Sequence, residues 1–301
     1  MFNRLLVPLD GSRLAESVLP VVRRLAGLVP CTVLLLHVIE KRAPSSIHGD
    51  THLRTAPQAE AYLSTVASGL REGGLTVDTH VHTVPQGDVP RCIAEHATEL
   101  DQDLIVLCSH GEGGVRRFVF GSNAEQVLTH DATPVMFIHA NEGAEAQGLG
   151  PERILVLVGG EPASRPALDM GIQLADLAHA HLYLLSVVPT LSSMNPEQAA
   201  TGRLAPRATR HILDLAAEQA FESLKLSVEE LTTRNIAATG RVERGDVAPA
   251  LIAVAQEVRA DLVIIAARGL AGLSAFWADA VTRKVAGVYD GALLLIHRAG
   301  T

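Results

Sequence analysis

Short apolar runs alternate with helical patterns along the first half of the chain. Two of these runs, at residues 5–9 and 33–38, are continuous, as is typical of parallel strands covered on both faces. Between them, apolar side chains recur at the spacing of one helical face, at Leu14, Val18, Val21, Val22 and Leu25. Ser12 precedes this series and is a candidate N-cap. The pattern predicts a strand, a helix and a second strand.

The alternation continues through the rest of the first half. Three further strands are predicted at residues 75–84, 104–107 and 135–139. Three further helices are predicted to begin after Pro57, at Asp88 as N-cap, and at Ser122. Strands that alternate with helices in this way predict an α/β domain with a doubly wound, five-stranded parallel sheet of the Rossmann-like type.

The chain is an internal repeat. Residues 4–11 (RLLVPLDG) match residues 153–160 (RILVLVGG) at an offset of 149 positions. The 21 residues that begin at Gly87 match those that begin at Gly245 at an offset of 158, so the second copy holds nine extra residues before Gly245. Residues 141–152 lack periodicity and are the natural linker. We therefore predict two tandem domains, at residues 1–142 and 153–301.

Composition and charge exclude several classes of protein. A net charge of −8, with scattered Lys and Arg, argues against a general nucleic-acid binder. The three cysteines, Cys31, Cys92 and Cys108, are an odd number without metal-type spacing, so neither a disulfide framework nor a zinc site is predicted. No apolar run approaches the roughly 18 residues of a membrane span, and the N-terminus leads directly into a strand. We expect a cytoplasmic protein.

Residues with binding chemistry converge on the carboxyl ends of the predicted strands, where such sheets bind ligands. Asp10 follows the first strand, Val38 ends the second, and the glycine-rich residues 108–114 follow the fourth. Backbone N–H groups of a glycine-rich turn and of a helix N-terminus can hold phosphate. Asp10 is placed to accept ribose hydroxyls, and backbone groups near Val38 are placed to read adenine.

With these residues the chain resembles the universal stress protein family over nearly its whole length, twice. ATP-binding members carry Gly, two residues, Gly, nine residues, and then Gly with Ser or Thr. Here the second glycine is Gly111 and the closing pair is Gly121 and Ser122, whereas Cys108 stands in the place of the first glycine. The nucleotide-binding set that the resemblance implies is Pro8, Leu9, Asp10, Val38, Cys108, His110, Gly111, Gly121, Ser122 and Asn123.

The second copy departs from this pattern. Gly159 stands in the place of Asp10, and Asp279 stands in the place of Gly121. A carboxylate where phosphate should lie is repulsive, by an amount on the order of 1 kcal/mol or more in a partly screened site. We predict that a nucleotide binds in the first domain only.

Nothing in the motif supplies a catalytic set, since a Walker lysine, paired metal-binding carboxylates and a nucleophile with a base are all missing. The sequence therefore favours a stress-response binding and signalling module that takes ATP or a related adenine nucleotide. One alternative is a weak ATPase with Mg²⁺ held by the phosphates and Ser122. Another, favoured by Cys108, is a nucleotide-free stress protein that acts through protein partners. A more distant one, a nucleotide alpha hydrolase, lacks the expected pyrophosphate loop after the first strand.

Three further expectations concern residues near this site. Cys108 could sense redox state, but we prefer the interpretation of a small buried thiol at a strand end. Asp78, His80 and His82 share one strand face and could bind a metal; because no further ligand is visible, we interpret them as a solvated face and predict no metal site. The resemblance also implies that the last strands of the two copies, residues 135–139 and 293–297, pair within the chain, and that the pair can form a homodimer.

Overall fold

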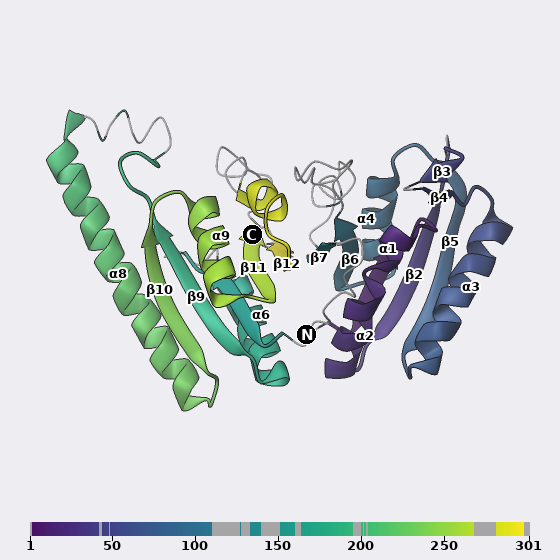
Figure 1. Cartoon of the computed structure of the whole chain (residues 1–301), viewed down its shortest axis with the longest axis horizontal. Helices are drawn as coiled ribbons and strands as arrows, with labels where there is room; N and C mark the ends of the chain where they lie inside the picture. Colours follow the sequence, from purple (N-terminus) through teal and green to yellow (C-terminus); the bar gives the residue numbers. More distant parts are fainter. Residues whose placement is uncertain are drawn as a thin grey trace. The chain divides into compact units, whose positions relative to one another are not determined.

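The chain forms two compact units (Figure 1). Unit 1 contains residues 1–150 and 292–299, and unit 2 contains residues 151–291 and 300–301. The computed structural model describes residues 2–41, 44–47, 49–109, 127, 133–139, 151–159, 164–194, 200, 202, 204–267 and 281–297. Each unit holds one copy of the repeat, except that the last strand of the second copy belongs to unit 1.

Unit 1 is built on a sheet of five parallel strands, in the order β7-β6-β1-β2-β5. These strands are β1 (Arg4–Pro8), β2 (Thr32–Glu40), β5 (Thr76–Gln86), β6 (Leu104–Ser109) and β7 (Val135–His139). The strand β12 (Ala292–His297) joins the sheet antiparallel to β7, with Leu293 opposite Phe137. The five-stranded parallel sheet predicted for the first copy and the predicted pairing of the two last strands are both confirmed.

Four helices of unit 1 lie in the described residues: α1 (Arg13–Glu16), α2 (Leu19–Leu28), α3 (Ala56–Glu72) and α4 (Val89–Glu99). The predicted caps are confirmed, because Ser12 Oγ accepts from the Ala15 amide at 3.1 Å and Asp88 Oδ1 accepts from the Arg91 amide at 3.1 Å. The prediction of a single helix after Ser12 is wrong. The segment forms two helices, α1 and α2, because Pro20 has no N–H to continue the helical hydrogen bonds.

Two short strands of unit 1 are absent from the sequence prediction. They are β3 (Ser46–Ile47) and β4 (Asp50–Thr51), which pair antiparallel as a small separate sheet. The helix predicted to begin at Ser122 lies outside the described residues.

Unit 2 contains four parallel strands in the order β10-β9-β8-β11. They are β8 (Arg153–Leu157), β9 (His181–Val188), β10 (Ala238–Arg244) and β11 (Leu262–Ala267). Three longer helices accompany them: α6 (Arg165–Ala178), α8 (Pro206–Thr233) and α9 (Val247–Val258). Of the helices in the described part of the chain, none is both long and apolar enough to serve as a membrane span.

The two copies share details of their backbone hydrogen bonding. The Leu9 amide donates to the Leu36 carbonyl at 2.8 Å, and 149 residues later the Val158 amide donates to the Leu185 carbonyl at 2.8 Å. The Asp103 carboxylate accepts from the amides of Asn3 and Arg4 at the start of β1, and the Asp261 carboxylate accepts from the amides of Glu152 and Arg153 at the start of β8. The repeat read from the sequence is therefore a repeat of structure.

Candidate functional site

The candidate site lies at the carboxyl ends of three neighbouring strands. In the sheet of unit 1, β1 lies between β2 and β6, and the pairing of Pro8 with Leu36 brings the end of β1 alongside Val38. Five predicted site residues are thereby gathered at one edge: Pro8, Leu9, Asp10, Val38 and Cys108. The other five lie outside the described residues: His110, Gly111, Gly121, Ser122 and Asn123.

Asp10 is held in place by the residue that caps α1. Its Oδ1 accepts from the Ser12 amide at 2.8 Å and from Ser12 Oγ at 2.7 Å. Gly11 between them has a φ of +93°, a left-handed conformation that a side chain would strain. Both hydrogen bonds use Oδ1, so the turn fixes the carboxylate while Oδ2 can accept from a hydroxyl group of a ligand.

A buried histidine fixes the turn from the neighbouring strand. His37 on β2 is 2% exposed, and its Nδ1 donates to the Leu9 carbonyl at 2.7 Å. The Leu9 amide in turn donates to the Leu36 carbonyl, so both backbone polar groups of Leu9, the residue before Asp10, are hydrogen-bonded to β2. The sequence placed His37 in a strand but did not assign it this positioning role.

The segment around β3 and β4 covers this turn and was missed by the sequence analysis. Asp50 accepts from the Arg13 amide at 3.0 Å and from Arg13 Nε at 3.3 Å. A Cβ placed on Gly11 would lie 2.7 Å from Leu53 Cγ, so this leucine packs directly over the turn. The signal for this contact was weak, because strands of two residues have no periodicity and Leu53 stands alone in a polar stretch.

The charge of this region is negative. Tyr62 donates from its hydroxyl to Glu16 Oε1 at 3.0 Å. Burial, followed by the charges of Glu16, Asp10 and Asp50, raises the pKa of Tyr62. Carboxylates accept hydrogen bonds and repel anions, so this part of the site suits the hydroxyl groups of a ligand rather than its phosphates.

Cys108 is the penultimate residue of β6, beside α1. Its Sγ accepts from Ser17 Oγ at 3.4 Å, and the residue is half-buried rather than fully buried as the sequence analysis expected. The difference follows from its position at the open end of the strand. Cys92, in contrast, is enclosed in α4, and burial raises the pKa of its thiol to about 11, which makes it a poor nucleophile.

In the described residues of unit 2, the equivalent edge lacks counterparts of the Asp10 carboxylate and the His37 ring. Gly159 takes the place of Asp10 and offers only backbone, with its carbonyl accepting from Ser164 Oγ at 3.0 Å. Ser186 stands on β9 where His37 stands on β2. The other replaced motif positions, such as Asp279, lie outside the described residues.

One expectation about β5 is wrong. His80 and His82 do not form a purely solvated face, because His96 of α4 packs against both rings, with ring centroids 4.9 Å and 5.0 Å away. Asp78 is exposed, as expected. The third histidine comes from another element, so no spacing within β5 could reveal it.

Comparison with known proteins gives one consistent result. The model of the universal stress protein family matches residues 1–139 and 151–297. A universal stress protein of Mycolicibacterium smegmatis is 25% identical over 297 residues, covering 94% of this chain and 92% of the relative. One of Synechocystis sp. is 30% identical over 139 residues, covering 46% and 86%. The crystal structure of a universal stress protein from Archaeoglobus fulgidus shares the fold, with a TM-score of 0.75, 18% identity, and coverage of 99% of this chain and 100% of that one.

Proposed function

Because the chain belongs to the universal stress protein family and carries its domain twice, we propose that the first domain, residues 1–142, binds ATP or a related adenine nucleotide. The second domain, residues 153–301, has no nucleotide and acts as a scaffold. The chain is then a stress-response binding and signalling module whose contacts with protein partners respond to the nucleotide. None of its three cysteines, all of which lie in the described residues, forms a disulfide, which fits a cytoplasmic location.

The observation that carries the proposal is the fixed carboxylate at the end of β1. Ser12 occupies Oδ1 of Asp10 through two hydrogen bonds, and Gly11 provides the left-handed turn that presents the carboxylate at the sheet edge. A vicinal diol such as ribose offers two hydroxyl donors to such a group. The neighbouring part of β2 at Val38, two residues before that strand ends, offers backbone groups suited to hydrogen bonding with an adenine ring.

The sequence supports a phosphate site beside this carboxylate. Gly111, Gly121 and Ser122 keep the family spacing that follows the fourth parallel strand. Such a loop and the N-terminus of the helix predicted after it supply unpaired backbone N–H groups for the anionic end of the nucleotide. The ribose hydroxyl groups would then donate to the Asp10 carboxylate, and the phosphates would accept from the backbone N–H groups of the glycine motif. Each end of the nucleotide would contact groups of complementary hydrogen-bonding character.

The proposal is tested by the nucleotide that the purified chain carries. We expect denaturation followed by chromatography of the supernatant to release about one adenine nucleotide per chain, because only the first copy keeps Asp10 together with the glycine motif. The variant Gly121→Asp copies the residue found at the same place in the second copy and is expected to carry none.

The matched control is Gly269→Asp, which adds the same charge to the glycine that survives in the second copy. It is expected to keep the nucleotide of the wild type. If the wild type carries no nucleotide and binds none at millimolar ATP, the nucleotide-free alternative replaces this proposal, and Cys108 becomes the mark of a lost site.

A further inference from the structure

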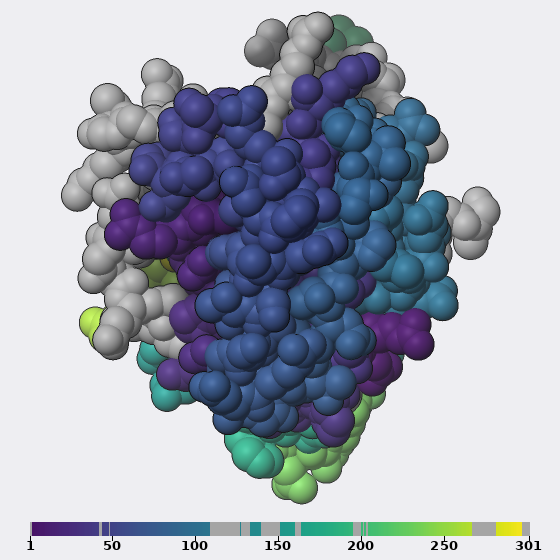
Figure 2. Space-filling model, turned by 90° about the vertical axis from the view of Figure 1, so that its right-hand side faces the viewer, coloured from purple at the N-terminus to yellow at the C-terminus, as the bar shows by residue number. Residues whose placement is uncertain are grey.

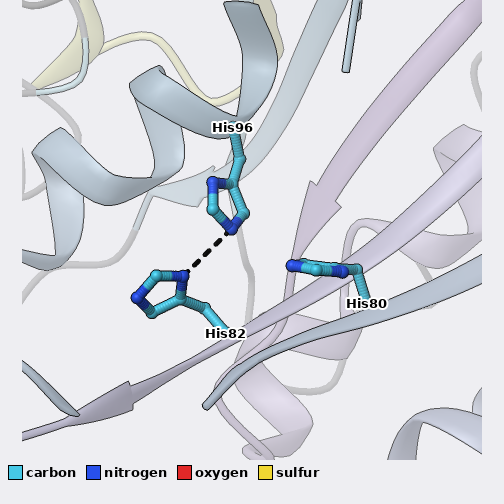
Figure 3. A group of neighbouring side chains, drawn as sticks. All are labelled: His80, His82 and His96. Atoms are coloured by element: carbon cyan, nitrogen blue, oxygen red, sulfur yellow. Dashed lines mark hydrogen bonds between the residues drawn. The ribbon is translucent and has the colours of Figure 1, made fainter. Parts of the chain in front are cut away.

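Three histidines of unit 1 point into one common space (Figure 3). His80 and His82 are two residues apart on β5, so their side chains leave the same face of the strand. His96 lies on α4 and reaches toward both from the helix that packs on this face. One ligand atom from each ring lies within 4.8 Å of those of the other two.

The spacing of these nitrogen atoms is close to that of a metal site. His82 Nδ1 lies 3.2 Å from His96 Nε2. Two imidazoles on a tetrahedral zinc ion, each at about 2.0–2.1 Å from the metal, have nitrogen atoms about 3.3 Å apart. Two of the three ligands therefore already have the required separation. The third, His80, needs to approach by at most about 1.5 Å, which a side-chain rotation on an edge strand can supply.

The outer nitrogen atoms of two rings lie beside groups that would orient them toward a metal. His82 Nε2 lies 2.9 Å from the Gln86 amide, whose oxygen and nitrogen exchange places by rotation of the side chain. When the oxygen faces the ring, Nε2 donates to it and Nδ1 is left with its lone pair. His96 Nδ1 is buried without a hydrogen-bond partner and lies 3.5 Å from Glu99 Oε2, so a small movement of Glu99 would complete the carboxylate–histidine arrangement that supports many metal ligands.

Access from solvent also fits a metal site. His96 is 8% exposed, whereas His80 is partly exposed on the edge strand of the sheet. In Figure 2 the indigo-to-blue part of the chain, which includes α3, β5 and α4, faces the viewer. An ion can enter from solvent and keep water as a fourth ligand.

We propose that His80, His82 and His96 form a binding site for a zinc ion, or for a first-row transition-metal ion with the same preference for imidazole. The site joins the edge strand β5 to α4 and lies one strand outside the proposed nucleotide edge, since His82 pairs in register with Val38. Three imidazoles and an open position resemble the ligand set of open zinc sites. Binding is expected to stabilise unit 1, because the ion links two elements of the folded chain only.

The test uses the full, untagged chain without nucleotide, dialysed against ZnCl₂ and analysed for bound zinc by atomic emission. We expect saturation at about one zinc per chain, and a loss of affinity of about a hundredfold or more in His82→Gln and in His96→Gln. The control His211→Gln changes an exposed histidine of α8 and is expected to bind zinc as the wild type does. Leaving out ATP makes the result independent of the proposed nucleotide site.

Two further measurements distinguish a zinc site from a cluster of histidines that only packs. Because His96 is buried, His80→Asn provides a variant at a partly exposed position that is expected to fold, by circular dichroism, and still lose zinc. Substitution with Co²⁺ is expected to give a visible spectrum without a thiolate charge-transfer band, since all three ligands are nitrogen atoms. Equal zinc binding by the wild type and the folded His80→Asn and His82→Gln variants would overturn the proposal, as would a wild type that binds no zinc.

Discussion

Replacing Phe137 with alanine is expected to lower the free energy of unfolding of unit 1 by about 3–5 kcal/mol. Phe137 is 2% exposed and lies in the middle of β7, opposite Leu107 of β6 on one side and Leu293 of β12 on the other. Its removal leaves a cavity at the place where the last strand of the second copy joins unit 1. The change is measured by urea unfolding of the full chain, from the transition assigned to unit 1.

The matched control is Phe221→Ala. Phe221 lies on α8 and is 58% exposed, so the same truncation is expected to change the unfolding free energy by less than about 0.5 kcal/mol. A similarly small effect for Phe137→Ala would contradict the position of β7 between two strands.

Replacing Asp10 with alanine is expected to lower the affinity for ATP by about ten- to a hundredfold, the worth of hydrogen bonds to a charged group. The carboxylate is fixed at the end of β1, and the proposed role of its Oδ2 is to accept from the ribose hydroxyls. The measurement is a calorimetric titration of the nucleotide-free chain with ATP and with 2′,3′-dideoxy-ATP. The analogue is expected to bind the wild type more weakly than ATP does, and to bind Asp10→Ala about as well as ATP does.

The variant Ser12→Ala distinguishes the role of the Asp10 carboxylate in binding from its role in stabilising the turn. This variant loses the hydroxyl that donates to Asp10 and caps α1, while the carboxylate and the bond from the Ser12 amide remain. Its affinity for ATP is expected to fall much less than that of Asp10→Ala. Equal losses in the two variants, with no preference for ATP over the dideoxy analogue, would mean that Asp10 only supports the turn.

The sheet of unit 1 could be predicted because its strands are continuous apolar runs that must be buried on both faces. Residues 5–9 and 33–38 are the clearest examples, and they became β1 and β2. The caps at Ser12 and Asp88 were equally readable, since a short polar side chain before an apolar helical pattern has a local role. These strands and caps depend on residues that are close in sequence, so they could be predicted from the sequence alone.

Features that depend on contacts between distant segments could not be predicted in the same way. The hairpin of β3 and β4 is positioned by two contacts, the packing of Leu53 against Gly11 and the hydrogen bond from the Arg13 amide to Asp50. Neither contact is marked by a periodic pattern in the sequence. The histidine cluster is a second example. His80 and His82 were recognised as neighbours on β5, but His96 joins them only because α4 packs on that face.

The candidate site was predicted in part for the same reason. The site residues near the carboxyl ends of β1, β2 and β6 could be placed together once the parallel sheet was recognised, because strand ends meet at one edge. The role of His37 could not, since a histidine in an apolar strand gives no indication of its partner. Its bond to the Leu9 carbonyl appears only when the two strands are side by side.

The central claim is that only the first of the two copies binds a nucleotide, and the stoichiometry of ATP binding tests it most directly. Equilibrium dialysis of the nucleotide-free full chain against labelled ATP is predicted to saturate at about one ATP per chain, because only one copy keeps a carboxylate and a glycine motif at the sheet edge. Saturation at two ATP per chain would contradict the loss of the site in the second copy. No binding up to millimolar ATP would contradict the site in the first.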